Sequence, residues 1–276
     1  MPAGTLYIVA TPIGNLADAS LRSIETLRAA DIVACEDTRT TRTLLARHGI
    51  GARTVALHAH NEKAASAKLL EALRAGRTVA LVSDAGTPGV ADPGAVLVGA
   101  AHRAGIRVSP VPGPSAAAAA FSASGFPAGR FLFAGFLPAA RAARRKALEA
   151  LELSCPVVLY EAPHRILETV EDLAARFGAD RELVIARELT KKFEEVVRLP
   201  LGGACAWLQA GAHRQQGEFV LVLAPAEARP EAPADAERVL RVLLEALAPS
   251  EAARLAARIT GMPKSLLYRK ALERSK

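Results

Sequence analysis

The first half of the chain alternates between short apolar runs and longer segments whose apolar residues recur every three or four positions. The short runs are rich in β-branched residues and end at turn-forming residues, which is typical of buried strands. The longer segments have the spacing of amphipathic helices. Together they predict a parallel sheet covered by helices on both faces. The predicted strands are Thr5–Ala10, Asp31–Cys35, Thr54–Leu57, Val79–Val82 and Ile106–Val111, the last broken by Pro110.

The second half has more strand and predicts a mixed sheet. Residues 125–130 predict a hinge between two α/β domains, and three prolines within 225–233 predict a linker. The helices that follow are joined by a turn with Gly261, as in a helix-turn-helix. We therefore expect an α/β fold with domains at 1–125 and 126–225 and a helical tail at 226–276. The predicted elements are strands at Phe131–Phe136, Val157–Tyr160, Leu183–Ala186, Glu195–Leu199 and Glu218–Leu223, and tail helices at Ala236–Leu247, Glu251–Ile259 and Lys264–Leu272.

One loop stands out because it is built from small residues. It follows the strand at Val79–Val82 and ends at Gly94. Small residues let a backbone approach a ligand closely, and α/β sheets bind ligands at the carboxyl ends of strands. Asp92 followed by Pro93 predicts a capped helix start, as Ser20 and Asn61 do elsewhere. A loop shaped only for packing is the alternative.

Composition narrows the function classes. The net charge is +7, which fits a polyanionic partner such as nucleic acid, although a solvated basic surface is the alternative. The three cysteines are isolated, so neither a metal site nor a disulfide framework is indicated, and a reducing cytoplasm is expected. The first apolar run is too short for a signal or a membrane span. Neither G-x-G-x-x-G nor the P-loop pattern occurs.

Charged clusters follow several strands directly. Glu36, Asp37 and Arg39 follow the second strand, Glu161 and Arg165 follow a later one, and another strand leads to Lys191. The two arginines suit phosphate or ribose contact better than catalysis. The alternatives are structural: Asp37 caps a helix and pairs with a neighbour, and Lys191 is solvated. A basic helix start near Arg141 is unfavourable to the helix dipole, which suggests a use for its charge; a solvated basic face is the commoner explanation.

Seven blocks in order resemble the tetrapyrrole methylase superfamily, and within it the small-subunit ribosomal RNA methyltransferase I family. They cover about 220 residues, and it is their combination that is specific. The blocks are V-A-T-P-I-G-N-L from Val9, A-C-E-D-T-R from Ala34, S-D-A-G-T-P to D-P-G from Ser83, P-G-P-S-A from Pro112, Y-E-A-P-H-R from Tyr160, R-E-L-T-K from Arg187 and G-E-F-V-L-V from Gly217.

The resemblance implies two α/β domains with S-adenosylmethionine in the cleft between them, and a homodimer. It also implies methylation of a cytidine ribose 2′-oxygen in the decoding region of 16S ribosomal RNA. At Gly89-Val90-Ala91 this chain departs from relatives that more often carry a bulkier residue and a serine, which affects the local cofactor contacts. Carried over by position, the cofactor contacts are Asp84, Ala85, Gly86, Thr87, Val90, Ser115, Ala116, Tyr160, Glu161 and Leu189.

The chemistry expected of this site is in-line methyl transfer, with a nearby base taking the hydroxyl proton. The candidate catalytic residues are Glu36, Asp37, Glu161 and Lys191, and the candidate RNA contacts are Arg39, Arg165, Lys264, Arg269 and Lys270. Two other functions remain open: methylation of a tetrapyrrole or other small metabolite, and RNA binding without catalysis.

Overall fold

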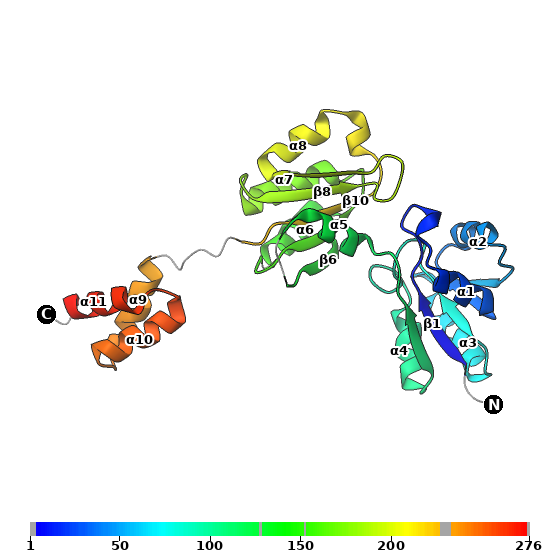
Figure 1. Cartoon of the computed structure of the whole chain (residues 1–276), viewed down its shortest axis with the longest axis horizontal. Coiled ribbons are helices and arrows are strands. Elements are labelled where there is room, and N and C mark those ends of the chain that lie inside the picture. The colour runs from blue at the N-terminus through cyan, green and yellow to red at the C-terminus, as the bar shows by residue number, and fades with distance from the viewer. Residues whose placement is uncertain (1–3, 127–128, 152, 227–232, 275–276) are drawn as a thin grey trace. The chain divides into compact units, whose positions relative to one another are not determined.

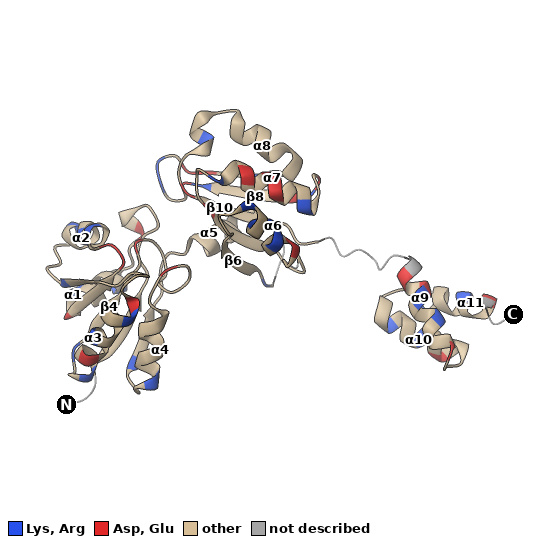
Figure 2. Ribbon diagram, turned by 180° about the vertical axis from the view of Figure 1, so that it is seen from behind, with Lys and Arg blue, Asp and Glu red and all other residues tan. Residues whose placement is uncertain are grey.

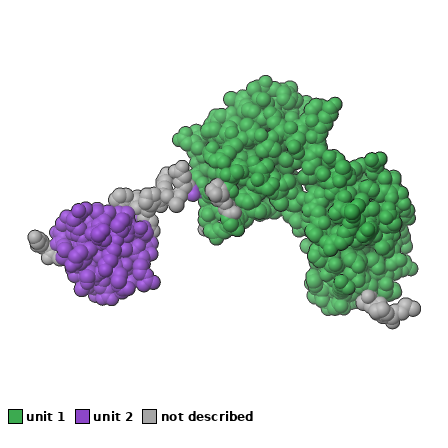
Figure 3. All heavy atoms as spheres, viewed as in Figure 1, with its two compact units in different colours: residues 1–225 green, residues 226–276 purple. Residues whose placement is uncertain are grey.

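The computed structural model describes residues 4–126, 129–151, 153–226 and 233–274. The chain forms two compact units, residues 1–225 and 226–276 (Figure 3). The first unit contains both sheets, each of five strands (Figure 1). The expected hinge includes residues 127 and 128, and most of the expected linker lies at 227–232, all outside the described residues.

The first sheet has the order β3-β2-β4-β1-β5, and every pair is parallel, as predicted. Pro110 lies inside β5, contrary to the expected break, because β5 is an edge strand where the missing N–H of proline is tolerated. The elements are β1 (Thr5–Val9), η1 (Leu16–Asp18), α1 (Leu21–Ala29), β2 (Ile32–Cys35), α2 (Thr38–Arg47), β3 (Arg53–Ala56), α3 (Glu62–Arg74), β4 (Val79–Leu81), α4 (Ala95–Arg103) and β5 (Arg107–Val111).

Alternation along the strands of this sheet divides its core into two layers. Leu6 and Leu81 pack on one face with α3 and α4, while Val9 and Ala80 pack on the other with α1 and α2. Successive residues of a strand point to opposite faces of the sheet. A strand that is covered on both faces therefore needs apolar residues at every position. This explains why the central strands lack the polar alternation of a half-exposed sheet.

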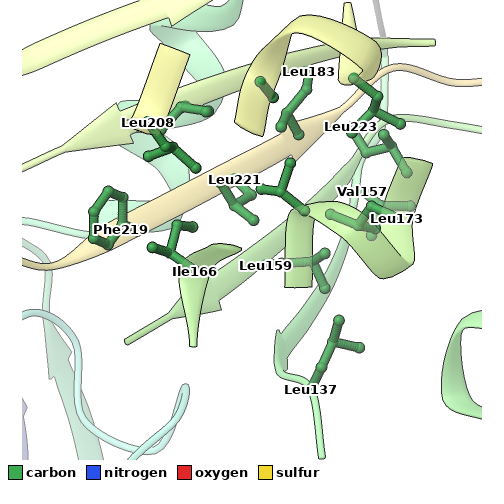
Figure 4. Packing of buried hydrophobic residues seen from close by; sticks show 14 of the residues in the cluster. Leu137, Val157, Leu159, Ile166, Leu173, Leu183, Leu208, Phe219, Leu221 and Leu223 are labelled. Atoms are coloured by element: carbon green, nitrogen blue, oxygen red, sulfur yellow. The ribbon is translucent and has the colours of Figure 1, made fainter. Parts of the chain in front are cut away.

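The second sheet has the order β6-β7-β10-β8-β9 and is mixed, as predicted, because only β6 and β7 are parallel. Leucines from its central strands and from α7 and α8 form the larger core cluster (Figure 4). The elements are α5 (Ala116–Ser124), β6 (Leu132–Phe136), α6 (Arg141–Glu149), β7 (Val157–Glu161), α7 (Ile166–Phe177), β8 (Glu182–Arg187), β9 (Glu195–Pro200), α8 (Leu201–Gln209), η2 (Ala212–Gln215) and β10 (Phe219–Leu223).

Helix α5 packs on the second sheet although it directly follows the first. Ala117 and Ala120 lie against Val158 and Val220, and the Ala117 N–H donates to the Tyr160 hydroxyl at 3.2 Å. Helix α5 therefore packs with the second sheet, although the sequence predicted that the first domain extends to residue 125 and so includes this helix. It also brings the loop after β5 to the second sheet.

The basic start of α6 has a structural use. Arg144 is 0% exposed, and its guanidinium reaches Asp172 at 2.8 Å and Glu168 at 2.9 Å, both on α7 (Figure 2). Arg141 and Arg145 also bind Asp172, at 3.1 and 2.9 Å. Burial by itself raises the pKa of Asp172, but hydrogen bonds from the three arginines outweigh it and hold that pKa below its usual range.

The second unit is a small three-helix cluster in the described residues. Its helices are α9 (Pro233–Leu244), α10 (Pro249–Thr260) and α11 (Lys264–Arg274). Gly261 ends α10 with a φ of 70°, the left-handed conformation that glycine adopts readily, and this creates the predicted turn. Alanines of α10 and Leu267 of α11 form the small core.

Candidate active site

A cavity of about 430 Å³ lies in the first unit, between the loops of the first sheet and the face of the second. All ten residues predicted to contact the cofactor line it. The first sheet contributes the loops after β1, β4 and β5, and the second contributes the ends of β6, β7, β8 and β10. The carboxyl ends of parallel strands thus form one wall, as expected for a ligand site in an α/β sheet.

The loop after β4 is held in place by the loop after β1. The backbones of Thr11 and Gly86 bond to each other in both directions, at 2.8 and 3.1 Å. Gly86 has a φ of 83°, and a Cβ there would lie 3.4 Å from Ile13 and 3.6 Å from a backbone oxygen. Thr87 donates to the Pro114 carbonyl at 3.1 Å, which ties this loop to the one before α5. The small residues therefore serve a tightly defined backbone path.

The predicted helix start at Asp92 is wrong. Helix α4 begins at Ala95, and its cap position is Gly94, with a φ of 135°. Oε1 of Glu62 accepts the N–H groups of Gly94 and Val96, at 2.7 and 3.2 Å, so a carboxylate from α3 caps α4. Asp92 is thereby left to line the cavity. Asn61 also differs from prediction, since its side chain accepts the His58 N–H and makes no cap bond to α3.

The wall from the second sheet is largely aromatic and aliphatic. Tyr160 packs edge-on against Phe133 and Phe136, with ring centroids 4.9 and 5.6 Å apart. Phe136 lines the cavity, and 57% of the residue is exposed. Burial raises the pKa of Tyr160, and the nearby Asp92 charge adds to this, although the hydrogen bond from Ala117 opposes it. Tyr160 is therefore a neutral hydroxyl at physiological pH.

Leu189 reaches the cavity from a strained loop. Its neighbours Glu188 and Thr190 have φ of 51° and 67°, in the left-handed region that non-glycine residues rarely adopt. Oε1 of Glu188 accepts the Glu218 N–H at 2.9 Å and the Lys191 ammonium at 2.8 Å. A Cβ on Gly217 would lie 2.4 Å from the Glu188 side chain, so glycine is required there. These contacts hold the strained loop and so place Leu189.

Three carboxyl groups lie at or beside the cavity without a direct ion pair among the described residues; the charge of His58 acts on Glu36, and Arg39 interacts electrostatically with Asp84. Asp84 and Asp92 line it, and Glu36 is close enough for their charges to act on it. None of the three belongs to an ion pair within the described ranges. Burial, then the charges of Asp92 and Asp84, raise the pKa of Glu36; burial, then Asp84, raise that of Asp92. The site is therefore electrostatically suited to a cation.

The other three catalytic candidates are occupied by structural bonds. Asp37 caps α2 by accepting the Arg39 N–H at 2.7 Å, and it pairs with the Arg39 guanidinium at 2.6 Å. These bonds lower the pKa of Asp37 to about 2. The Asp37 N–H donates to Asp84 at 3.0 Å, which links the cluster to the cavity wall. The side chain of Arg39 remains 88% exposed.

Glu161 is fully buried and fully bonded. Its carboxylate accepts the Ala162 N–H at 2.8 Å, the Thr169 hydroxyl at 2.6 Å and the Arg165 guanidinium at 3.0 Å. Arg165 also donates to the Leu137 carbonyl at 2.8 Å. The pair therefore fixes the loop between β7 and α7, which leaves Arg165 little freedom to meet RNA. That helix begins at Ile166, three residues after the predicted start at Pro163.

Lys191 bonds to two carboxylates, Glu188 at 2.8 Å and Glu218 at 2.9 Å. Burial lowers the pKa of Lys191, but these two hydrogen bonds outweigh it and leave the pKa raised. A lysine that stays protonated cannot accept a proton at neutral pH. Its stem also packs where a Cβ on Gly14 would lie, 2.5 Å away.

The three basic residues of the second unit that were predicted to contact RNA differ in whether they form an ion pair. Lys270 pairs with Glu237 on α9. Lys264 and Arg269 are exposed and take part in no ion pair in the described part of that unit.

Several lining residues were missed from the sequence. Asp92 was assigned to a helix cap, Glu218 directly precedes β10, and Phe219 begins that buried strand. The only signal for Ile13 and Ala162 was their position in the family blocks, which does not reveal which side chains point into a cavity. Ile13, Ala91, Asp92, Phe136, Ala162, Pro163, Ala186, Glu218, Phe219 and Val220 complete the lining.

Family models match both units. Residues 5–205 match the family described as Tetrapyrrole (Corrin/Porphyrin) Methylases, and residues 230–275 match the RsmI C-terminal HTH domain. A solved uroporphyrin-III C-methyltransferase from Thermus thermophilus, complexed with S-adenosylhomocysteine, shares the fold with a TM-score of 0.55 and 18% identity. It covers 80% of this chain and 97% of its own. The fold and the cavity thus define the tetrapyrrole methylase class.

Sequence relatives narrow this class. A ribosomal RNA small subunit methyltransferase I from Mesorhizobium japonicum is 51% identical, covering 97% of this chain and 91% of the relative. Its namesake from Pseudomonas aeruginosa is 48% identical, covering 99% of each. The chain belongs to the ribosomal RNA small subunit methyltransferase I family of tetrapyrrole methylases. No helix in the described ranges is both long and apolar enough to cross a membrane.

Proposed function

We propose that this protein transfers a methyl group from S-adenosylmethionine to the 2′-oxygen of a cytidine ribose in the decoding region of 16S ribosomal RNA. Its family membership makes it an S-adenosylmethionine-dependent ribosomal RNA methyltransferase. The proposal goes beyond family membership in naming the methylated position in the RNA and the atom that accepts the methyl group. The observation that carries the proposal is the cavity in which the ten expected cofactor residues meet unpaired carboxyl groups.

The residues of the cavity fit S-adenosylmethionine. The volume of about 430 Å³ is within the range of small-molecule sites. The cofactor carries two positive groups, and Asp84 and Asp92 form no ion pair in the described part of the chain. Its adenine needs apolar surface, which Phe136, Tyr160 and Leu189 supply. The first turn of α5, at Ser115 and Ala116, favours the cofactor carboxylate.

When bound, S-adenosylmethionine supplies a methyl group on a sulfonium, so transfer breaks one C–S bond, forms one O–CH₃ bond and releases a neutral thioether and one proton. The residues of this chain hold the two reactants in line, which contributes most of the acceleration. Of the four candidate catalytic residues, Glu36 suits the proton acceptor best. Its carboxylate is unpaired, and its raised pKa makes it a stronger base than an ordinary glutamate.

The proposal includes a homodimer acting in the cytoplasm, with RNA meeting Arg39 on α2 and Lys264 and Arg269 on α11. The edge strand β6 begins at the exposed Leu132, and Phe131 directly before it is also exposed; apolar residues of this kind occur at subunit interfaces. Light scattering tests the dimer, since a single-chain mass at working concentrations would contradict it.

The test is transfer of labelled methyl groups to small ribosomal subunits from cells that lack this enzyme. We expect one ribose-methylated cytidine, mapped by nuclease digestion. Label in a base, or in a small metabolite and not in RNA, would refute the proposal. Calorimetry with S-adenosylhomocysteine addresses the remaining alternative, because a protein that only binds RNA gives no heat.

The variant Glu36→Gln tests the base. We expect kcat to fall by about 10²-fold or more, with unchanged affinity for S-adenosylhomocysteine, since the amide keeps the shape and loses the proton acceptor. The matched control is Asp37→Asn, whose carboxylate is already engaged by Arg39. Equal losses in both variants would count against Glu36.

A further inference from the structure

A second cavity of about 280 Å³ adjoins the cofactor cavity in the first unit. We call it the threonine pocket. Its lining comes from the loops after β1 and β4 and from the first turns of α2. The lining residues are Thr11, Pro12, Leu16, Thr40, Thr41, Thr43, Leu44, Ser83 and Asp84.

The threonine pocket lies where a second reactant would have to be. Strands β2, β4 and β1 are neighbours in the sheet, and the pocket is at their carboxyl ends. Asp84 lines both this pocket and the cofactor cavity. A molecule in the threonine pocket would therefore contact the same carboxylate as a molecule in the cofactor cavity, so the two reactants would lie next to each other.

The lining suits a neutral polar molecule. Hydroxyl groups both donate and accept hydrogen bonds, as the edges of a nucleobase and a ribose require. Thr41 is 3% exposed, and its buried hydroxyl lies near the thiol of Cys35 without a well-formed hydrogen bond among the described residues. The pocket is small for a ligand site, so a single nucleoside fits the volume better than a tetrapyrrole.

The charges outside the pocket have the opposite sign to the carboxylate inside. Arg39, Arg42 and Arg47 are exposed on α2 (Figure 2); Asp37 at the N-cap pairs with Arg39, whereas Arg42 and Arg47 make no ion pair among the described residues. Arginines on a helix surface are the usual partners of RNA phosphates. The Asp84 carboxylate repels a phosphate from the interior. The distribution of charge therefore separates a neutral nucleoside inside from its phosphates outside.

We propose that the threonine pocket receives the target nucleoside, turned out of the RNA, while Arg39 and Arg42 hold the flanking phosphates. Enzymes that modify a nucleotide commonly remove it from the stack in this way. This inference rests on the proposed function, because it takes an RNA ribose as the methyl acceptor. It adds where that acceptor binds.

Filling the pocket is the direct test. In the double variant Thr40→Trp/Thr43→Trp we expect the KM for small subunits to rise by about tenfold or more, because an excluded nucleoside weakens binding. Affinity for S-adenosylhomocysteine should stay within about twofold, which also reports correct folding. The control is Lys68→Trp/Glu71→Trp, which places two exposed tryptophans at the same helical spacing on α3.

A single substitution of an exposed residue tests the same proposal with less risk to folding. Arg42→Glu should raise the KM several-fold and lower its dependence on salt by about one phosphate contact. Arg53→Glu, at the opposite end of the sheet on β3, should change neither. If the wild-type enzyme methylates RNA and the Thr40→Trp/Thr43→Trp variant has the same KM, the threonine pocket is not the nucleoside site, and the proposed function still stands. A wild-type enzyme that labels no RNA overturns the proposed function and, with it, this inference.

Discussion

Two groups of charged side chains in this protein differ in whether they have a partner of opposite charge: the buried network between α6 and α7, and the half-buried Asp84 and Asp92 at the cofactor cavity. Between α6 and α7, the Asp172 carboxylate meets three arginines, and the buried Arg144 meets two carboxylates. Beside the cofactor cavity, Asp84 and Asp92 form no ion pair among the described residues. Matched charges hold two helices together, whereas at the cavity burial and the charge of Asp84 raise the pKa of Asp92, and the two carboxyl groups favour a positively charged ligand.

The largest expected effect breaks the matched network. Arg144→Met should lower the free energy of unfolding by about 3–5 kcal/mol, because it leaves Asp172 and Glu168 without their buried partner. Urea denaturation followed by circular dichroism measures this. Arg145→Met, whose side chain is 56% exposed, should cost less than about 1 kcal/mol. Similar losses in both variants would show that burial does not distinguish these arginines.

Next comes the unmatched site. Asp84→Ala with Gly86→Val should weaken S-adenosylhomocysteine binding by about 100-fold or more, because it removes a carboxylate and strains a left-handed position. Isothermal titration calorimetry measures the affinity. Gly105→Val introduces similar strain at a φ of 67° with no neighbour within 4 Å, so it should reduce thermal stability alone. Wild-type affinity in the double variant would remove this loop from the site.

A smaller effect concerns pH. A bound cation lowers the raised pKa of Asp92, so binding releases protons and affinity should fall as pH drops through that raised pKa. Asp92→Asn should flatten this dependence. Because the folded pKa is raised, the contribution of Asp92 to stability decreases as pH rises through it, so the asparagine variant should melt higher at neutral pH without ligand. An equally steep pH profile in the variant would assign the titration to another group.

The smallest expected effect concerns the same contrast, between paired and unpaired charges, in the second unit. Arg269→Glu, an exposed residue without an ion pair among the described residues, should weaken RNA binding a few-fold and reduce its salt dependence. Lys270→Glu should instead destabilise the three-helix unit, because it places a carboxylate against Glu237. RNA filter binding and thermal melts separate the two results. The opposite pattern would reverse the roles of these neighbours.

The site could be predicted from the sequence to the extent that it is local. Loops that follow strands indicated this edge of the sheet, and the family resemblance supplied the ten expected cofactor residues, all of which line one cavity in the structure; their contact with the cofactor stays a prediction. The sequence pattern does not show which residue forms an ion pair or hydrogen bond with each charged side chain. Glu161 and Lys191 looked available because each has, besides a nearby partner, one from another element: Thr169 for Glu161 and Glu218 for Lys191.

The sequence by itself determined the two sheets, because strand and helix periodicity are properties of consecutive residues. It also determined the cap at Ser20 and the turn at Gly261, whose contacts lie within a few positions. Only the tertiary structure decided that Glu62 caps α4 and releases Asp92 to the cavity. It alone placed α5 on the second sheet and paired Arg144 with Asp172. These outcomes depend on distances between residues far apart in the chain, which hydrophobic patterns do not encode.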